Sequence, residues 1–367
     1  MEPFIPEHIL TLTQNASNPQ LLFQQETLLY ANPAFQKQFP NFTVGCSAES
    51  VFGPGVEQLR QFSGEGCLLF TASLSGITTD IRLIRLEHLT LAQLLPDPEG
   101  ISASTLQSIS RSLAEPLTSI KVLSPKLLPL LTQSEDPVIL EQTAQFNKSL
   151  YNILRVSNHI RYSATEKPRL NNKTMDIMEW LREFSQKIEP LCTMSGRTLT
   201  TEIPPTEVLV PFDPELLELA LLNLVSNAIK FTGSDGLIHL SAAMIGRARL
   251  HITLRDNGRG IPAHQMAQLF SNSKTVPLIP DPRQGIGLGL PMARKILLAH
   301  NGSLFLESHE GEGTAVHLAL PVSRGLGSLQ LKAPVLVPEI SGGISSLLLE
   351  LADALPAKAF HIHDTEI

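Results

Sequence analysis

Three polar residues share one face of an otherwise apolar segment in the C-terminal half of the chain. Asn223, Asn227 and Lys230 are spaced by four and three residues within LLNLVSNAIKFT, so a helix would place them on one side. The opposite side of that helix is apolar and is expected to be core. An amide oxygen can ligate Mg²⁺ and a lysine can meet phosphate charge, so this face fits a phosphate–Mg²⁺ unit.

A second candidate segment, residues 256–260, reads DNGRG and follows a strand expected at 250–254. Its glycines allow a tight turn and let a ligand approach the backbone. Asp256, at the end of the strand, could accept a hydrogen bond from an exocyclic amine. A plain β-turn also favours Asp-Asn-Gly, so this segment alone predicts only a turn.

Glycines recur in two further segments. Gly285, Gly287 and Gly289 precede a helix expected at 291–300, and glycine amides at a helix N-terminus can bind an anion. No Gly-Lys-Ser/Thr follows, so this is not a Walker A loop, and the spacing also differs from GxGxxG, which argues against NAD binding. The fourth segment, GEGT at 311–314, lies between two expected strands and alone would be a hairpin turn.

Taken together, in this order and spacing, the four segments resemble the nucleotide-binding motifs of the GHKL superfamily. That superfamily includes gyrase, chaperone, mismatch-repair and histidine kinase ATPases. SNAIKFT and LLAHNGSLFLESHEGEGTAVHLALP are similar to the histidine kinase branch in particular. The resemblance implies an α/β sandwich of the GHKL ATPase type over residues 172–322, with ATP and Mg²⁺ as its ligands.

The resemblance also assigns roles at the phosphate end of the nucleotide. Asn227 would ligate the Mg²⁺ that bridges the triphosphate. Asn223 and Lys230 would face the phosphates and act as catalytic residues. The three glycines within 285–289 would close over the phosphates.

At the adenine end, the resemblance implies that Asp256 binds the adenine amino group. Gly258 and Gly260 would shape the floor of this site, and Thr314 would lie near the adenine. Residues 269–284 would form the ATP lid, a segment expected to be mobile because lids of this kind gate access.

The N-terminal part, residues 1–98, is expected to form a PAS-like α/β sensor domain. Apolar runs at 21–23 and 27–30 flank a polar turn and predict a hairpin. Asn32 and Pro33 then open a short helix, because Asn caps helices well and Pro suits the first turn. Further strands are expected at 67–70 and 80–86. A domain that only dimerises or transmits a signal fits these features as well as a ligand-binding one.

Residues 102–166 predict two helices with apolar stripes, which would be buried best by pairing with a second copy as a four-helix bundle in a homodimer. The first helix resembles the dimerisation and phosphotransfer helix of histidine kinases. Arg111 stands where that family has its phosphoacceptor histidine, and Ser112 replaces the acidic residue after it. A guanidinium stays protonated and cannot act as the nucleophile. Ser110, Ser112 and His159 are weaker candidates for a replacement acceptor.

Two functional hypotheses follow. The chain is a cytoplasmic two-component-type sensor histidine kinase homologue that uses Mg-ATP for phosphoryl transfer, with a response regulator or a partner kinase as its partner. Alternatively, because Arg111 replaces the phosphoacceptor, the chain is a pseudokinase that acts as an ATP-binding regulatory scaffold. A gyrase-like or chaperone ATPase is disfavoured, because the chain is short and a helical pair precedes the ATPase region.

Composition limits the partners. The net charge is −7 without a Lys/Arg cluster, which argues against nucleic acid. No run of about 20 apolar residues is present, so no membrane span is expected. The N-terminus lacks the basic start and apolar run of a signal peptide, and three cysteines without metal spacing suit a reducing cytoplasm.

The last segment, residues 323–367, extends beyond the usual end of the family. Residues 344–355 predict a short amphipathic helix and residues 359–363 a possible strand. This C-terminal extension is expected to pack on the body of the protein or on a partner.

Overall fold

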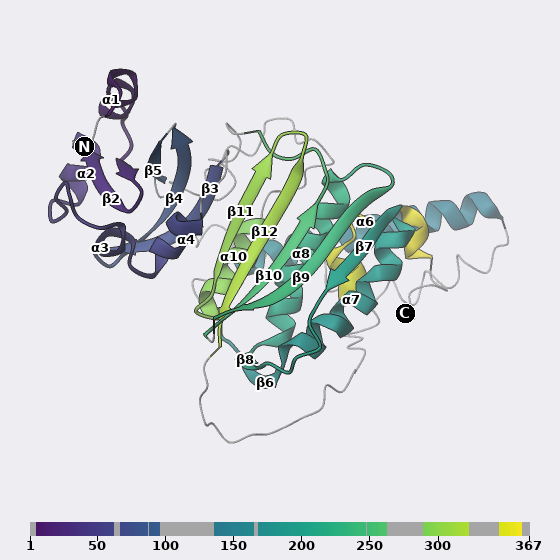
Figure 1. Cartoon of the computed structure of the whole chain (residues 1–367). Helices are drawn as coiled ribbons and strands as arrows, with labels where there is room; N and C mark the ends of the chain where they lie inside the picture. The colour runs from purple at the N-terminus through teal and green to yellow at the C-terminus, as the bar shows by residue number, and fades with distance from the viewer. Residues whose placement is uncertain are drawn as a thin grey trace. The chain divides into compact units, whose positions relative to one another are not determined.

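A computed structural model describes residues 5–61, 67–86, 88–95, 136–164, 168–246, 248–262, 289–322 and 345–361. The chain divides into two compact units, whose elements are labelled in Figure 1. The first unit comprises Met1–Gly100, Gly260–Lys274 and Ser303–Val316. The second comprises Ile101–Arg259, Thr275–Gly302 and His317–Ile367.

The first unit combines short helices with an antiparallel sheet. Its elements are α1 (Glu7–Gln14), β1 (Gln20–Gln24), β2 (Thr27–Ala31), α2 (Pro33–Gln38), α3 (Ala48–Phe52), η1 (Gly53–Gly55), α4 (Val56–Gln61), β3 (Cys67–Leu74), β4 (Ile77–Leu86), β5 (Leu89–Leu95) and β11 (Ser303–His309). The strand order is β2-β1-β5-β4-β3-β11. The predicted hairpin is confirmed as β1 and β2, and the two further predicted strands as parts of β3 and β4. The strand β5, which sequence analysis did not name, pairs with both β1 and β4.

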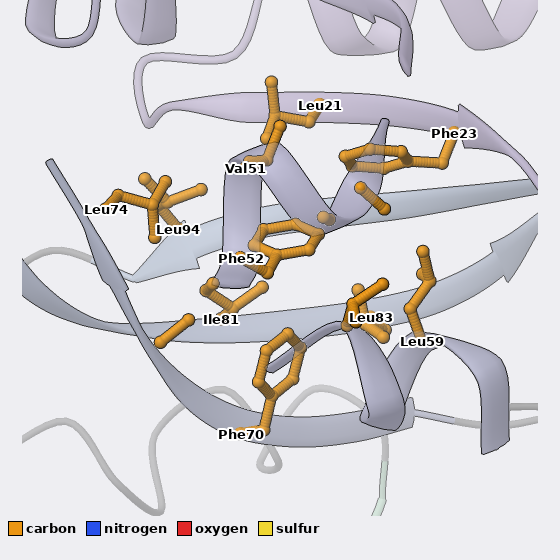
Figure 2. Packing of buried hydrophobic residues seen from close by; sticks show 14 of the residues in the cluster. Leu21, Phe23, Val51, Phe52, Leu59, Phe70, Leu74, Ile81, Leu83 and Leu94 are labelled. Carbon is orange, nitrogen blue, oxygen red and sulfur yellow. The ribbon is translucent and has the colours of Figure 1, made fainter. Parts of the chain in front are cut away.

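The core of the first unit lies between its sheet and α3 and α4. Phe52 is the centre of this core: its ring lies 5.2 Å from that of Phe23 and 5.6 Å from that of Phe70, measured between centroids. Figure 2 shows these rings with the aliphatic side chains of the strands, among them Leu21 and Leu83. Burying one such side chain contributes about 1.5–3 kcal/mol, so a few aromatic rings account for much of the unit's cohesion.

Asn32 connects three segments of the first unit. Its side-chain oxygen accepts hydrogen bonds from the backbone N–H of Phe35, at the start of α2, and of Gln20. Its amide nitrogen donates to the carbonyls of Thr13, Ala16 and Asn18. The predicted helix cap is therefore confirmed, and the same fully buried side chain also fixes the connection between α1 and β1.

We expect Asn32→Ala to loosen this region, because it leaves buried backbone groups without partners, at about 1–3 kcal/mol for each group. Hydrogen–deuterium exchange should become faster over residues 13–38. Asn41→Ala, at an exposed position, is the matched control. Equal exchange in the two variants would contradict the connecting role of Asn32.

The second unit is an α/β sandwich. Its elements are α6 (Pro137–Ala164), β6 (Lys173–Asp176), α7 (Ile177–Met194), β7 (Arg197–Glu202), β8 (Leu209–Phe212), α8 (Pro214–Phe231), β9 (Gly236–Ile245), β10 (Arg249–Asp256), α10 (Gly289–Ala299), the C-terminal half of β12 (Gly313–Pro321), α11 (Ser346–Glu350) and η2 (Ala357–Phe360). The sheet has the order β12-β10-β9-β7, with β7 parallel to β9. In Figure 1, α7, α8 and α10 lie on one face of this sheet. The helix expected to carry Asn223, Asn227 and Lys230 is confirmed as α8, the helix expected at 291–300 as α10, and the strand expected at 250–254 as β10.

Apolar packing joins the helices to the sheet. The inner side of α8 carries Leu217, Leu221 and Val225, all fully buried. In α7, Trp180 stacks on Phe184 and meets Phe212 of β8 edge-on. The small two-stranded sheet formed by β6 and β8, which sequence analysis did not predict, thus closes over one end of α7.

The thiol of Cys192 is free and buried in α7. Burial raises its pKa to about 12, since it disfavours the thiolate. A thiol held in this way stays protonated at neutral pH.

The predictions for the helical hairpin and the C-terminal extension are confirmed only in part. The second predicted helix is confirmed as α6, whereas the first, with Ser110, Arg111 and Ser112, lies outside the described residues. In the extension the predicted helix is present but shorter, as α11. The predicted strand at 359–363 is wrong where the chain is described: Ala359 and Phe360 belong to the 3₁₀ turn η2, which follows Pro356 and packs on α6 instead of a strand edge.

Among the helices that the structure describes, none is both long enough and apolar enough to cross a membrane.

Candidate functional site

The helix α8 is fixed at its N-terminus by Asp213. The carboxylate of Asp213 accepts hydrogen bonds from the backbone N–H groups of Glu215 and Leu216, and Pro214 occupies the first turn. The backbone N–H of Asp213 donates to Nε2 of His300, directly after α10. This cap sets the position of α8, because it satisfies donors that no helix can satisfy internally.

The outer side of α8 carries the polar residues that sequence analysis selected. Asn223 is fully buried and Lys230 nearly so, while Asn227 is half-buried. Asn223 donates to the carbonyl of Leu219, 2.8 Å away. Ser226, which sequence analysis missed, lies between them on the same face. The predicted shared face is therefore confirmed, and it is more deeply buried than a solvated surface.

Two acidic residues of the C-terminal extension contact this polar face. Asp353 forms an ion pair with Lys230 and accepts a hydrogen bond from the hydroxyl of Ser226 at 2.8 Å. Glu350 accepts from the amide of Asn223 at 3.4 Å. The expectation that the extension packs on the body of the protein is confirmed by these contacts within the second unit.

The helix α6 completes this cluster with Arg155 and His159. Arg155 forms ion pairs with both Glu350 and Asp353, and its guanidinium also donates to Asn223 and Ser226, each at 3.4 Å. His159 lies 2.8 Å from Glu350, measured from Nε2 to the carboxylate. His159 is thus buried and paired with a carboxylate.

The charges of this cluster shift one another's pKa values. Burial lowers the pKa of Lys230, and the attraction of Asp353 offsets only part of that effect. For Asp353, burial acts to raise the pKa, but Arg155, Lys230 and the hydrogen bond from Ser226 outweigh it, and the net pKa lies below its ordinary value. At neutral pH Asp353 is therefore ionised, and its carboxylate is held by Arg155, Lys230 and Ser226.

The DNGRG segment folds against the C-terminal end of α8. Asp256, at the end of β10, accepts a hydrogen bond from the backbone N–H of Gly258, and Arg259 donates its N–H to the carbonyl of Phe231. A Cβ on Gly258 would lie 2.5 Å from that same carbonyl oxygen, so only glycine fits there. The turn that sequence analysis predicted is confirmed, and it places a nearly buried carboxylate beside α8.

In the first unit, Gly260 and Thr314 meet around the β11–β12 turn. Gly260 has φ +64°, and a Cβ there would lie 1.9 Å from the carbonyl oxygen of His309. The hydroxyl of Ser308 accepts from the N–H of Ile261 and lies 2.9 Å from that of Thr314. Ser308 carried no sequence signal, because a serine within a strand is common.

The comparison with known proteins agrees with this geometry. A model of the family described as histidine kinase-, DNA gyrase B-, and HSP90-like ATPase matches residues 212–324. The adaptive-response sensory kinase SasA of Crocosphaera subtropica is 27% identical over 228 residues, covering 60% of this chain and 59% of that protein. The chain is a sensor histidine kinase homologue.

The matched part of the chain spans 59% of the length of the Crocosphaera subtropica SasA. A second SasA, from Thermosynechococcus vestitus, is 32% identical over 158 residues, which cover 43% of this chain and 41% of that protein. Among solved structures, full-length ShkA in complex with AMPPNP aligns with a TM-score of 0.46 and 22% identity, over 62% of this chain and 48% of that chain.

Gly289 is the one glycine of the 285–289 segment within the described residues of this histidine kinase homologue. It begins α10, and a Cβ added to it would lie 2.8 Å from the side-chain oxygen of Asn223. The start of α10 and the middle of α8 therefore approach closely. Gly285, Gly287, the lid at 269–284 and Arg111 lie outside the described residues.

Sequence reasoning missed Arg155, Glu350 and Asp353. A signal for the first was available: Asn147, Tyr151, Arg155 and His159 recur at every fourth position and so share one side of α6. No comparable signal marks Glu350 and Asp353, since two acidic residues in a short helical segment are ordinary surface composition. Their role follows only from the fold.

We expect Asp353→Asn to lower the free energy of unfolding of the histidine kinase homologue by about 3 kcal/mol at pH 7, because it leaves the buried Lys230 without its anion. The pKa of Asp353 is lowered from 3.8, so its contribution is complete above that pH and is lost as the pH falls through the lower folded-state value. Urea denaturation followed by the fluorescence of Trp180 should therefore show a difference between variant and wild type that shrinks below pH 3.8. The exposed Glu189→Gln is the control, and a pH-independent difference would contradict the assignment.

Proposed function

We propose that the second unit of this sensor histidine kinase homologue binds Mg-ATP at the polar face of α8. The observation that carries the proposal is the burial of Asn223, Ser226 and Lys230 on one face, beside the half-buried Asn227. Buried amides and ammonium groups require partners, and this donor set already holds carboxylates. The same donors suit the oxygens of a triphosphate.

Roles follow for each residue in this proposal. Asn227 ligates Mg²⁺, and Asn223 and Lys230 position the phosphates. Bound Mg²⁺ supplies neutralisation of the charge on the phosphate oxygens. The described residues contain no cluster of three or more His, Cys, Asp or Glu side chains suited to a metal, which is compatible with an ion held by one amide and the nucleotide itself.

We assign the adenine to Asp256 and Gly258, and the resemblance to GHKL ATPases adds Gly260 and Thr314 to this assignment. Support comes from the carboxylate of Asp256, which the N–H of Gly258 holds in a fixed turn at the end of β10. Such an anchored carboxylate can accept a hydrogen bond from an exocyclic amine without a further loss of conformational entropy. We assign Gly285, Gly287 and Gly289 to the phosphate side.

For the reaction, phosphoryl transfer breaks the bond between the γ-phosphorus and its bridging oxygen, releases ADP and forms a new bond to a nucleophile. Arg111 cannot serve as that nucleophile, because guanidinium has no available lone pair at ordinary pH. We therefore place the acceptor on another protein, such as a response regulator or a partner kinase, ahead of the weaker candidates Ser110, Ser112 and His159. His159 is a poor acceptor while it is buried against Glu350.

A regulatory scaffold is the second candidate function. It retains ATP binding but dispenses with transfer, and Arg111 at the phosphoacceptor position favours it. A homodimer belongs to both candidates. It is supported by apolar side chains that α6 leaves exposed, namely Val138, Ile139, Phe146 and Ile153.

The proposed site predicts that Asn227→Ala weakens binding of a fluorescent ATP analogue, titrated with Mg²⁺, by at least about tenfold, equivalent to about 1.4 kcal/mol. The loss follows from removal of the proposed metal ligand. Asn172→Ala changes an exposed amide and should leave the affinity unchanged. Failure of both the wild type and a chain that ends at residue 344 to bind at millimolar concentrations would overturn the proposed site.

Incubation with γ-labelled ATP and Mg²⁺ separates the two candidate functions. A scaffold accumulates no label although it binds the analogue. Acid-labile, base-stable label that is absent from Asn227→Ala would show that a histidine is phosphorylated, and His159→Ala is then the next variant. Acid-stable label would indicate Ser110 or Ser112.

A further inference from the structure

The nucleotide-facing side of α8 is covered by a segment of the chain itself. Residues 345–361, comprising α11, a turn and η2, contact both α6 and α8. In Figure 1 the yellow C-terminal helices lie beside α6. Their acidic residues Glu350 and Asp353 contact Asn223, Ser226 and Lys230, which are the donors of the proposed phosphate site or lie between them.

We propose that residues 345–361 form an intramolecular competitor of ATP, in which the carboxylates of Glu350 and Asp353 occupy the positions of phosphate oxygens. This inference rests on the proposed function of α8. It adds a ligand, the C-terminal segment, to the site and predicts that nucleotide and segment exclude each other.

The exclusion follows from donor capacity and charge. Lys230 and Ser226 each already bond a carboxylate oxygen of Asp353, and both side chains are buried. A triphosphate that uses these donors must displace that carboxylate. Leaving both anions in place would put like charges within a few ångströms in a medium of low dielectric constant, where repulsion is strong.

Arg155 connects the acidic residues of the segment to the polar face of α8. It lies on α6, yet its guanidinium contacts both acidic residues of the segment as well as Asn223 and Ser226 of α8. Guanidinium binds carboxylate and phosphate with the same planar set of donors. Arg155 can therefore remain at the polar face of α8 and exchange one anion for the other.

The segment has an anchor outside the phosphate site. Phe360 packs edge-on against Tyr151 of α6, with ring centroids 5.3 Å apart, and its carbonyl accepts from the amide of Asn147 at 3.0 Å. Leu351 and Leu355 are also buried. Apolar contacts thus hold the segment to α6, while the carboxylates alone oppose the nucleotide.

The energetics favour exchange over a permanent contact. Buried ion pairs lose much of their attraction to desolvation, and Nε of Arg155 has no hydrogen bond among the described residues. The segment belongs to the same chain, so its effective concentration at the site does not change with protein concentration, and nucleotide must overcome it by concentration and affinity. A segment held this way sets a threshold for nucleotide binding.

The test is titration of the full chain with N-methylanthraniloyl-ATP and Mg²⁺, comparing wild type with Glu350→Gln/Asp353→Asn. The double variant keeps side-chain size but removes both charges, and we expect its affinity to be at least tenfold higher. Glu189→Gln/Glu207→Gln, at two exposed positions, is the matched control with unchanged affinity. A chain that ends at residue 344 should reproduce the gain if the double variant folds poorly.

Hydrogen–deuterium exchange of the unmodified protein gives a second readout. Mg-ATP should speed exchange over residues 346–360, because the displaced segment loses its helical contacts. Equal affinities in wild type and the double variant, together with unchanged exchange, would overturn the competitor while Asn227→Ala still tests the site. Absence of analogue binding in every variant, with native circular dichroism, would overturn the proposed function and this inference together.

Discussion

The second unit depends on how the polar side of α8 is neutralised. Burying Lys230 and Arg155 without anions would cost several kcal/mol each, so the structure requires a negatively charged partner at this place. Glu350 and Asp353 supply it from more than 100 residues further along the chain. This requirement links α6, α8 and the C-terminal segment, which apolar contacts between Phe360 and Tyr151 also hold together.

The helix α8 packs on the sheet with one side and presents polar side chains on the other. Apolar residues on the inner side bind α8 to the sheet, and the capped N-terminus fixes its direction. The polar side is then held at a constant distance from the carboxyl end of β10, where Asp256 lies, and from the start of α10. Precision at the site therefore comes from regular elements rather than from long loops, which is the arrangement that best limits the entropy cost of binding.

Local signals in the sequence were sufficient for most elements. The strand at 250–254, the spacing along α8 and the cap at Asn32 were predicted correctly, because each depends on residues close together in the sequence. The strand β5 and the pairing of β6 with β8 were missed, since short strands acquire their identity from partners distant in sequence. The expected strand after residue 358 failed for the opposite reason: packing of Phe360 on Tyr151 decides the local conformation there. Contacts of Arg155 with Glu350 and Asp353 join segments almost 200 residues apart. The periodicity of the sequence cannot predict contacts over such a separation.

The hydrogen bond between Asp213 and His300 joins the helices α8 and α10 at one end. It ties the first residue before α8 to the residue just after α10, while the other end of α10, at Gly289, lies beside Asn223. The two helices thus run in opposite directions and share one fastened end. Any change in the angle between them leaves that end in place and moves Gly289 the most, over the length of an 11-residue helix. The hydrogen bond from backbone to imidazole therefore fixes one end of the helix pair, and the packing of α10 on α8 alone fixes Gly289 at the other.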